Sequence, residues 1–221
     1  MQAANDCIAL GYKGFTAIEF GVAGGNGLIA LEKHAITIEE FTGIEIQIIG
    51  LDTGTGMPPP KDFRDVPYLW QSGFYNMNVP LLKSCLQRSK LLLGPVRSTI
   101  DDLTKLVSAD NPIAFIAFDL DYYSSTMDAF SLFDANERNF IPRVWCYFDN
   151  LPNILPFAGE HLAIVDFNRK SKDRKLGKPG MLVHTIPFNP DWANQIYQLH
   201  ILKHERYGLN VNSGEQLPLT E

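Results

Sequence analysis

Short apolar segments of strand length alternate along this chain with longer segments of helix length. The apolar runs are nearly continuous, which is typical of strands that are buried on both faces of a sheet. They predict strands at residues 16–22, 46–52, 90–93, 112–119 and 144–149. Helices are predicted at 28–41, 78–88, from about 98 onwards, at 125–135 and at 162–167. Residues 181–188 and 196–203 alternate apolar and polar side chains, and they predict a closing pair of antiparallel strands.

Strands that alternate with helices predict the α/β class, because a helix usually returns the chain before the next parallel strand pairs. We expect a Rossmann-like, doubly wound sheet of seven strands, mostly parallel, with the antiparallel pair at its end. The sequence has no internal repeat and no linker, so residues 1–221 are expected to form a single domain. Ligands of such sheets bind beyond the carboxyl ends of the strands, so the residues that follow each strand are the candidates for function.

Composition excludes several classes of protein. The chain has 221 residues, of which 45% are hydrophobic and 20% charged, as in an ordinary soluble protein. The formal net charge of −6 argues against nucleic acid as a partner, since phosphate binding needs a positive surface. No run approaches the roughly 18 apolar residues that span a bilayer, so no membrane partner is expected. The chain start lacks a secretory signal, and three cysteines without a CxxC pair suit a reduced, cytoplasmic protein.

Two segments are predicted to be loops. The proline-rich segment 57–68 is too rigid and too poor in N–H donors for a helix or a central strand. Segment 169–178 carries six basic residues and one acidic residue. A solvated loop is the favoured interpretation of this charge run, and a surface that attracts an anionic substrate is the alternative.

A glycine-rich segment, EFGVAGGNG, joins the first predicted strand to the first predicted helix. Glycine permits a tight turn and lets a ligand approach the backbone, and the free N–H groups at a helix start add partial positive charge. The candidate cofactor-binding residues of this segment are Glu19, Gly21, Gly24, Gly25 and Gly27.

Two nucleotide cofactors compete for this segment, and a glycine turn without any ligand is the third interpretation. Gly25, Gly27 and Ala30 satisfy the GxGxxG/A spacing of dinucleotide sites, but they stand late relative to the strand. S-adenosylmethionine sites place an acid two residues before the first glycine, where it receives the amino group of the donor. Glu19 stands there, ahead of Gly21, so S-adenosylmethionine is the cofactor we expect.

Three further residues are candidates for the nucleotide. Asp52 ends the second predicted strand, where a carboxylate can accept both ribose hydroxyls. The alternative for Asp52 is a purely structural one, because Asp-Thr-Gly also favours a turn. Gly94 and Ser98 follow the third predicted strand, and they are weaker candidates for lining the adenine.

Acidic residues end the fourth and fifth predicted strands. Asp119 and Asp121 follow one of these strands, while Asp149 and Asn150 follow the other. Asp119 and Asp121 are the candidate catalytic residues, and Asp119 is also placed beside the cofactor. Asp119, Asp149 and Asn150 form a set of oxygen ligands suited to Mg²⁺, which would lower the pKa of a bound hydroxyl. The alternative is that the aspartates cap the next helix or hydrogen-bond the loop.

The pattern DxDxYxST resembles the macrocin O-methyltransferase-like family. It is met here by Asp119, Asp121, Tyr123, Ser125 and Thr126. Together with EFGVAGGNG, the resemblance extends over residues 19–150, and later segments fit it loosely. It implies methylation of a small-molecule acceptor, often a sugar hydroxyl in natural-product pathways. Related enzymes generally carry further N-terminal helices over the acceptor, so either this site is open, or further residues or a partner subunit in a homo-oligomer complete it.

The metal candidates also resemble the site of catechol O-methyltransferase, whose first aspartate matches Asp119. The macrocin-like family more often has Asp-Asp where this chain has Asp149-Asn150, although Asn150 still offers an oxygen ligand. The catalytic lysine of the catechol enzyme has no match, because Tyr122 stands at about its place. The identity of the general base is therefore open.

The expected function is metal-assisted O-methylation, and two alternatives remain. One is a non-catalytic nucleotide-binding or regulatory domain, and the other is an NAD-dependent oxidoreductase. His200 and His204 fall on a predicted strand, so packing or surface roles are favoured for them over metal binding. His161 and His184 are minor candidates for the base. Trp70 is a candidate wall of the acceptor pocket, and packing within its own loop is the equally good alternative.

Overall fold

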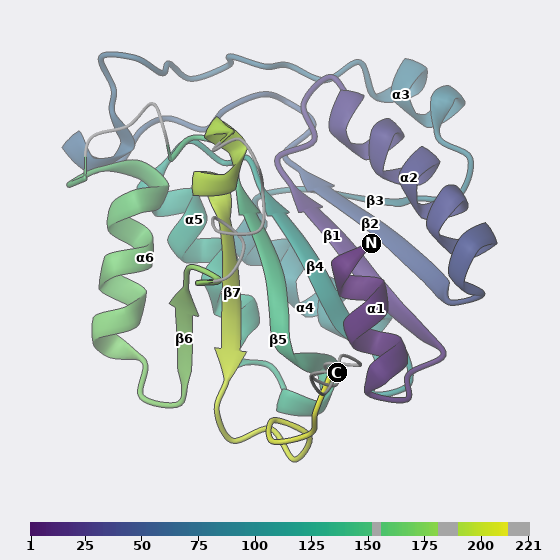
Figure 1. Cartoon of the computed structure of the whole chain (residues 1–221). Coiled ribbons are helices and arrows are strands. Elements are labelled where there is room, and N and C mark those ends of the chain that lie inside the picture. Colours follow the sequence, from purple (N-terminus) through teal and green to yellow (C-terminus); the bar gives the residue numbers. More distant parts are fainter. Residues whose placement is uncertain (152–155, 181–189, 212–221) are drawn as a thin grey trace, which may run out of the picture.

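One mixed sheet organises the chain, of which residues 1–151, 156–180 and 190–211 are described in the computed structural model. The strand order in this part of the chain is β3-β2-β1-β4-β5-β7-β6. The strands are β1 (Gly14–Phe20), β2 (Glu45–Asp52), β3 (Lys90–Leu93), β4 (Ile113–Phe118), β5 (Phe140–Phe148), β6 (Arg174–Gly177) and β7 (Ile196–Ile201). The first five pair in parallel, and β7 is antiparallel to β5 and β6 (Figure 1). The predicted seven-stranded, doubly wound fold is confirmed.

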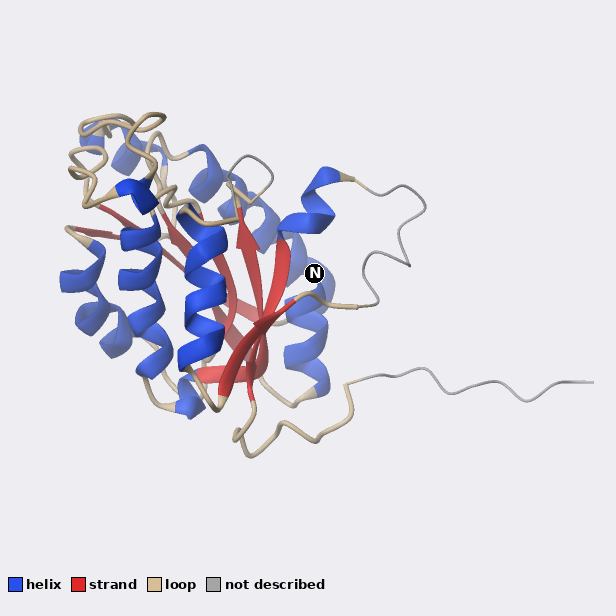
Figure 2. Ribbon diagram, turned by 90° about the vertical axis from the view of Figure 1, so that its left-hand side faces the viewer, coloured by secondary structure: helices blue, strands red, loops and turns tan. Residues whose placement is uncertain are grey.

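Helices cover both faces of this sheet (Figure 2). They are α1 (Gln2–Ala9), α2 (Asn26–Thr42), α3 (Val79–Cys85), α4 (Val96–Leu106), α5 (Tyr123–Ala129) and α6 (Gly159–Lys170). Four short 3₁₀ turns lie at Phe63–Asp65, Phe130–Asp134, Glu137–Asn139 and Asp191–Gln195. Helices α1 and α2 lie on one face, and α4, α5 and α6 lie on the other (Figures 1 and 2).

Burial on both faces explains why the central strands are so apolar. Every residue of β1 is buried, and β1 pairs with β2 on one side and β4 on the other. The rings of Phe20, Phe118 and Phe148 stack across the three neighbouring strands β1, β4 and β5, with centroids 5.5 Å and 4.6 Å apart. This stack lies just below the strand ends, so the core fixes the positions from which the site residues emerge.

The predicted closing strand pair is only partly right. Strand β7 confirms the strand predicted at 196–203, whereas 181–188 lies outside the described residues. Within the described chain, the outer partner of β7 is β6, which lies in the basic segment predicted as a loop. The Arg174 side chain explains how a basic segment forms a strand here, since it donates to the carbonyl oxygen of Ala135 and stacks over Phe140. An aliphatic stem can pack on apolar surface while its charge is satisfied elsewhere.

The helices α4, α5 and α1 differ from the prediction. Helix α4 begins at Val96, after Pro95, rather than near Ser98, because proline is favourable where no helical N–H bond is required. Helix α5 ends at Ala129 and continues as a 3₁₀ turn. Helix α1 was not predicted, and its Asp6 accepts a hydrogen bond from the indole of Trp145 at 2.7 Å, which ties the helix to the sheet.

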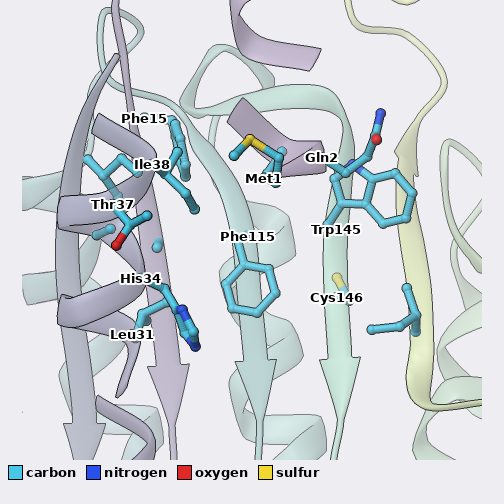
Figure 3. A pocket seen from close by; sticks show the side chains of 15 residues that line it. Met1, Gln2, Phe15, Leu31, His34, Thr37, Ile38, Phe115, Trp145 and Cys146 are labelled. Atoms are coloured by element: carbon cyan, nitrogen blue, oxygen red, sulfur yellow. The ribbon is translucent and has the colours of Figure 1, made fainter. Parts of the chain in front are cut away.

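A groove of about 470 Å³ lies between α1 and α2 on the open part of the sheet face (Figure 3). Phe15, Phe115 and Trp145 from the sheet and Leu31 and Ile38 from α2 point into it. The described residues that line it include His34 but no carboxylate.

No helix of the described chain is both long and apolar enough to cross a bilayer. All three cysteines are free thiols, as expected from their spacing. Cys7 and Cys146 are buried in the core, and Cys85 is exposed.

The aromatic stack yields a prediction about stability. Phe118→Ala should lower the free energy of unfolding by about 3–5 kcal/mol, because it removes a fully buried ring and leaves a cavity. Phe41→Ala is the control, since Phe41 is 80% exposed and its truncation should change stability by less than about 0.5 kcal/mol. Urea unfolding at constant m-value measures both. Equal effects of the two substitutions would show that the stack does not hold the sheet together.

Candidate functional site

The site begins where the strand order reverses, between β1 and β4. A doubly wound sheet leaves a crevice at this switch point, and ligands bind there. The two strand ends lie very close, because the Asp119 N–H donates to the Phe20 carbonyl at 2.9 Å. A β-carbon on Gly21 would lie 1.9 Å from the carbonyl oxygen of Asp119, and Gly21 has φ +87°. Only glycine therefore permits this approach of the two chains.

Asp52 holds the glycine-rich turn in place. One carboxylate oxygen accepts the N–H groups of Val22 at 3.0 Å and Ala23 at 2.9 Å, and the other accepts that of Gly54 at 2.7 Å. These bonds stabilise a turn in which Ala23 has the unusual φ of +45°. The structural alternative for Asp52 is thus realised, while its predicted bond to a ribose stays a prediction.

Glu19 is a buried carboxyl group at the crevice. Its side chain is 7% exposed, and its Oε2 has no hydrogen-bond partner within the described part of the chain. Its Oε1 lies against the start of α2, since a β-carbon on Gly27 would be 2.0 Å from that oxygen. Burial, followed by the negative charges of Asp119 and Asp52, raises the pKa of Glu19 to about 8. A buried oxygen without a partner is costly, and a positively charged ligand would relieve this cost.

A cavity of about 510 Å³, here called the strand-end cavity, opens beyond the carboxyl ends of β2, β4 and β5. Its lining includes Gly21 and Asp52 near the crevice, and Asp119, Asp121, Asp149 and Asn150 from the loops after β4 and β5. The structure thus brings Asp52, Asp119, Asp121, Asp149 and Asn150 together on one cavity, while Glu19 is not among its lining residues. Its volume falls within the range of small-molecule sites.

Burial and neighbouring negative charges raise the pKa of the two aspartates after β4. Asp119 is open to the cavity but surrounded by protein, and this loss of solvent, with the charge of Asp149, raises its pKa to about 6. Asp121 is 8% exposed, and burial, with the charges of Asp119 and Asp149, raises its pKa to about 7. A carboxyl group with a pKa near neutrality can act as a general base.

Asp121 sits in a turn that few side chains adopt. Its φ is +55°, and the N–H of Tyr122 donates to the carbonyl of Leu120 across it. Residues other than glycine are strained in this conformation, and such strain gathers at functional sites. The turn directs the carboxyl group of Asp121 into the lining of the cavity.

The loop after β5 supplies the other candidate metal ligands. The Tyr147 hydroxyl donates to Asp149 Oδ1 at 2.7 Å, and the Asn150 amide lies 3.5 Å from Asp119 Oδ1. No cluster of three His, Cys, Asp or Glu side chains with metal-binding geometry occurs among the described residues. The candidate ligands are the carboxylates of Asp119 and Asp149 and the amide oxygen of Asn150. Such a small set is compatible with a cation that keeps several waters.

The segment between β2 and α3 forms the wall of the cavity that faces away from the sheet. It passes along the upper edge in Figure 1, reaches α5 and α6, and returns to α3. Asp65 fixes it, because its buried carboxylate accepts the N–H and the hydroxyl of Ser124, both at 2.8 Å. Trp70 and Tyr75 then line the cavity, so the predicted role of Trp70 as a wall fits its position.

The remaining candidates are not among the residues that line the cavity. Gly94 and Ser98 flank the lining residues Pro95 and Val96, and the Ser98 hydroxyl donates to the Pro95 carbonyl. His200 and His204 have packing roles, since His200 bonds the Tyr207 hydroxyl and His204 is buried. His161 lies on α6, and His184 is outside the described residues.

Sequence analysis missed several residues that shape the site. Asp65 and Glu160 are fully buried acids whose partners lie far away in the chain, such as Ser124 for Asp65 and Leu120 for Glu160. Spacing cannot reveal such pairs. Tyr75 gave a weak signal, as one of several aromatic residues in a proline-rich loop.

Several solved structures of methyltransferases have the same fold. No family model and no curated protein sequence matches the chain. The calicheamicin methyltransferase CalS11 is 23% identical, with a TM-score of 0.60 over 90% of this chain and 76% of that chain. An apo structure of CalS11, named a TDP-rhamnose 3'-O-methyltransferase, is 19% identical, with a TM-score of 0.50 over 90% of this chain and 77% of that one. The O-methyltransferase NovP is 15% identical, with a TM-score of 0.55 over 76% of this chain and 69% of that one.

The raised pKa of Glu19 predicts a pH-dependent stability of the ligand-free protein. The pKa is about 8 when folded and 4.5 in the reference state, so Glu19 binds a proton more tightly in the folded chain. Its contribution to stability is full below the lower value and is lost as the pH rises through the higher one. Because one pKa unit corresponds to about 1.4 kcal/mol, this loss should amount to a few kcal/mol.

Glu19→Gln should therefore be more stable than wild type at about pH 8.5 and should depend less on pH above about pH 5. Asp119 and Asp121 contribute with the same sign, so the curve of the variant should be shallower rather than flat. Urea unfolding across this pH range is the measurement. Parallel curves for the two proteins would mean that Glu19 is not buried as described.

Proposed function

We propose that the chain is an S-adenosylmethionine-dependent methyltransferase that methylates a hydroxyl group of a small molecule. The observation that carries this proposal is the buried, unpartnered oxygen of Glu19 at the switch point of a methyltransferase fold. S-adenosylmethionine brings a positively charged amino group and a sulfonium to such a site. Both charges are favourable beside the carboxyl groups of Glu19, Asp52 and Asp119. Burial, followed by the charges of the two aspartates, raises the pKa of Glu19.

The position of Glu19 also argues against a dinucleotide. Its Oε1 lies against the first turn of α2, near Gly27, which is where a dinucleotide fold places the pyrophosphate. A carboxylate there would repel phosphate. The start of the helix already faces the carboxyl group of Glu19, so the oxidoreductase alternative is disfavoured.

Residues on the other side of the cavity suit transfer to oxygen. Asp121 is the candidate base, because its carboxyl group is held in the cavity by a strained turn and its pKa is raised to about 7. Accepting the proton of an acceptor hydroxyl would leave the oxygen free to attack the donor methyl group. Asp119, at the same strand end, would orient the acceptor beside the donor.

The same residues would hold a divalent cation. Asp119, Asp149 and Asn150 offer oxygen ligands, and a cation would favour the charged form of Asp119, whose pKa is raised by burial and by the charge of Asp149. Mg²⁺ would supply Lewis acidity that lowers the pKa of the acceptor hydroxyl. The bond from Tyr147 would orient Asp149 toward the set.

The cavity favours a ring-shaped acceptor with hydroxyl groups. Trp70, Tyr75, Met57 and Pro58 offer apolar contact, and the acids at the strand ends offer hydrogen-bond acceptors. A sugar or phenol presents both an apolar ring face and hydroxyl donors. The carbohydrate-modifying enzyme CalS11 shares the fold, which is consistent with a sugar-like or natural-product-like acceptor.

The cofactor assignment predicts a selective response to ligand. S-adenosylhomocysteine, the demethylated product, should raise the melting temperature, because binding adds about 2.7 kcal/mol at a hundredfold excess over the dissociation constant. NAD should leave the melting temperature unchanged. Glu19→Gln should weaken S-adenosylhomocysteine binding about tenfold or more, since it replaces a charged partner of the amino group. Stabilisation by NAD alone would replace the assignment with a dinucleotide site.

The acceptor side predicts a difference between two aspartates. With tritiated donor and a panel of sugars and phenols, Asp121→Asn should lower the rate of methyl transfer by about 10²–10⁴-fold at saturating Mg²⁺, because it removes a base. Asp149→Asn should instead raise the Mg²⁺ concentration needed for half-maximal rate. Chelation should stop transfer but leave donor binding intact. Full activity in chelator would exclude the metal, and full activity of Asp121→Asn would exclude Asp121 as the base.

A further inference from the structure

Glu160 bonds to two loops at once. It lies in the first turn of α6, and its side chain is fully buried. One carboxylate oxygen accepts the N–H of Leu120 at 3.4 Å, and the other accepts the N–H of Asn150 at 3.1 Å. These two donors belong to the loops that follow β4 and β5.

Both N–H groups lie just past the last bonds of the sheet. The Asp119 N–H still donates to the Phe20 carbonyl, and the Asp149 N–H still donates to the Phe118 carbonyl at 3.0 Å. The next residue of each loop has no neighbouring strand to bond. A buried N–H without a partner is costly. Glu160 supplies the acceptor that a neighbouring strand would otherwise provide, once for the loop after β4 and once for the loop after β5.

The loops that Glu160 joins carry the acids of the strand-end cavity. Leu120 stands between Asp119 and Asp121, and Asn150 is itself in the lining with Asp149. A shift of either loop would change the separation of these groups. We propose, on the basis of the methyltransferase function proposed above, that Glu160 is a positioning residue that holds the acids after β4 and β5 in one arrangement for a cation and an acceptor hydroxyl.

The described contacts favour this role over two simpler ones. Glu160 is not part of the cavity lining, so it does not contact a ligand directly. It also does not cap its own helix, because its bonds go to residues 10 and 40 positions away in the chain. Loss of a residue that supports metal ligands typically lowers metal affinity roughly 10–100-fold.

Glu32 provides a matched control within the same chain. It is 3% exposed and accepts the backbone N–H groups of Gln87, Arg88 and Ser89, at the connection between α3 and β3. It therefore makes the same kind of contact as Glu160, a buried carboxyl group that accepts backbone N–H groups, but it is not among the residues that line the cavity.

The test compares Glu160→Gln with Glu32→Gln. Glutamine keeps one acceptor oxygen but turns an NH₂ group toward the second N–H. In Glu160→Gln we expect the amides of Leu120 and Asn150 to exchange with solvent deuterium roughly tenfold faster or more. Binding of Mn²⁺, as a probe of the oxygen ligands, should weaken roughly tenfold or more, while binding of S-adenosylhomocysteine should change less than about threefold. Glu32→Gln should leave both affinities unchanged.

The outcomes separate this inference from the function on which it rests. Unchanged exchange at Leu120 and Asn150, or equal loss of Mn²⁺ affinity in both variants, would overturn the positioning role. A wild type that binds neither Mn²⁺ nor S-adenosylhomocysteine would overturn the proposed function, while faster exchange in both loops would still support the bridge between them. If Glu160→Gln does not fold, Glu160→Asp keeps both oxygens but is one methylene shorter, and it should loosen at least one loop and weaken Mn²⁺ binding.

Discussion

The role of each buried carboxyl group in this protein depends on whether backbone N–H groups donate hydrogen bonds to it. Asp52, Asp65 and Glu160 accept N–H groups from segments that are distant in the chain, and they fix the glycine turn, the cavity wall and the two acidic loops. Asp52 and Glu160 act just beyond strand ends, where the sheet no longer supplies partners. Asp65 acts at the first turn of α5, where the N–H groups have no helical partners. Carboxylate oxygens therefore accept hydrogen bonds from backbone N–H groups that have no backbone acceptor.

Glu19 and Asp121 are acids of a different kind. Each is buried, and its pKa is raised to about 8 for Glu19 and about 7 for Asp121, primarily by burial. One oxygen of Glu19 has no partner in the described chain. The fold thus holds carboxyl groups close together at the place where doubly wound sheets bind ligands. The proposed cationic cofactor would explain this arrangement, because it would offset the cost in stability of keeping these groups buried and close together.

The strand pattern predicted the sheet well, because strands buried on both faces are apolar throughout. It also placed Asp119 and Asp149 at adjoining strand ends, which the parallel pairing of β4 with β5 confirms. The pattern could not distinguish a carboxylate that accepts backbone N–H groups from one that is available to bind a ligand. Asp52 illustrates this limit, since its position suits a ribose, but three N–H groups already contact it.

Long-range partners account for the other misses. Glu160 is a single acid before an apolar helix, and nothing in its neighbourhood indicates that it bonds residue 120. Strand β6 was not predicted because its basic residues suggest a loop. In the structure, the Arg174 side chain donates to the carbonyl oxygen of Ala135 and lies over the ring of Phe140, both from elsewhere in the chain. Such features depend on tertiary contacts and not on local pattern.

A crystal structure with S-adenosylhomocysteine tests the central claim most directly, namely that the unpartnered carboxylate oxygen of Glu19 is there for the amino group of a methyl donor. The expected result is the amino nitrogen within about 2.7–3.2 Å of a Glu19 oxygen, with the sulfur facing the loop of Asp119 and Asp121. Binding elsewhere, or an amino group held by other residues while Glu19 Oε2 stays unpaired, would contradict it.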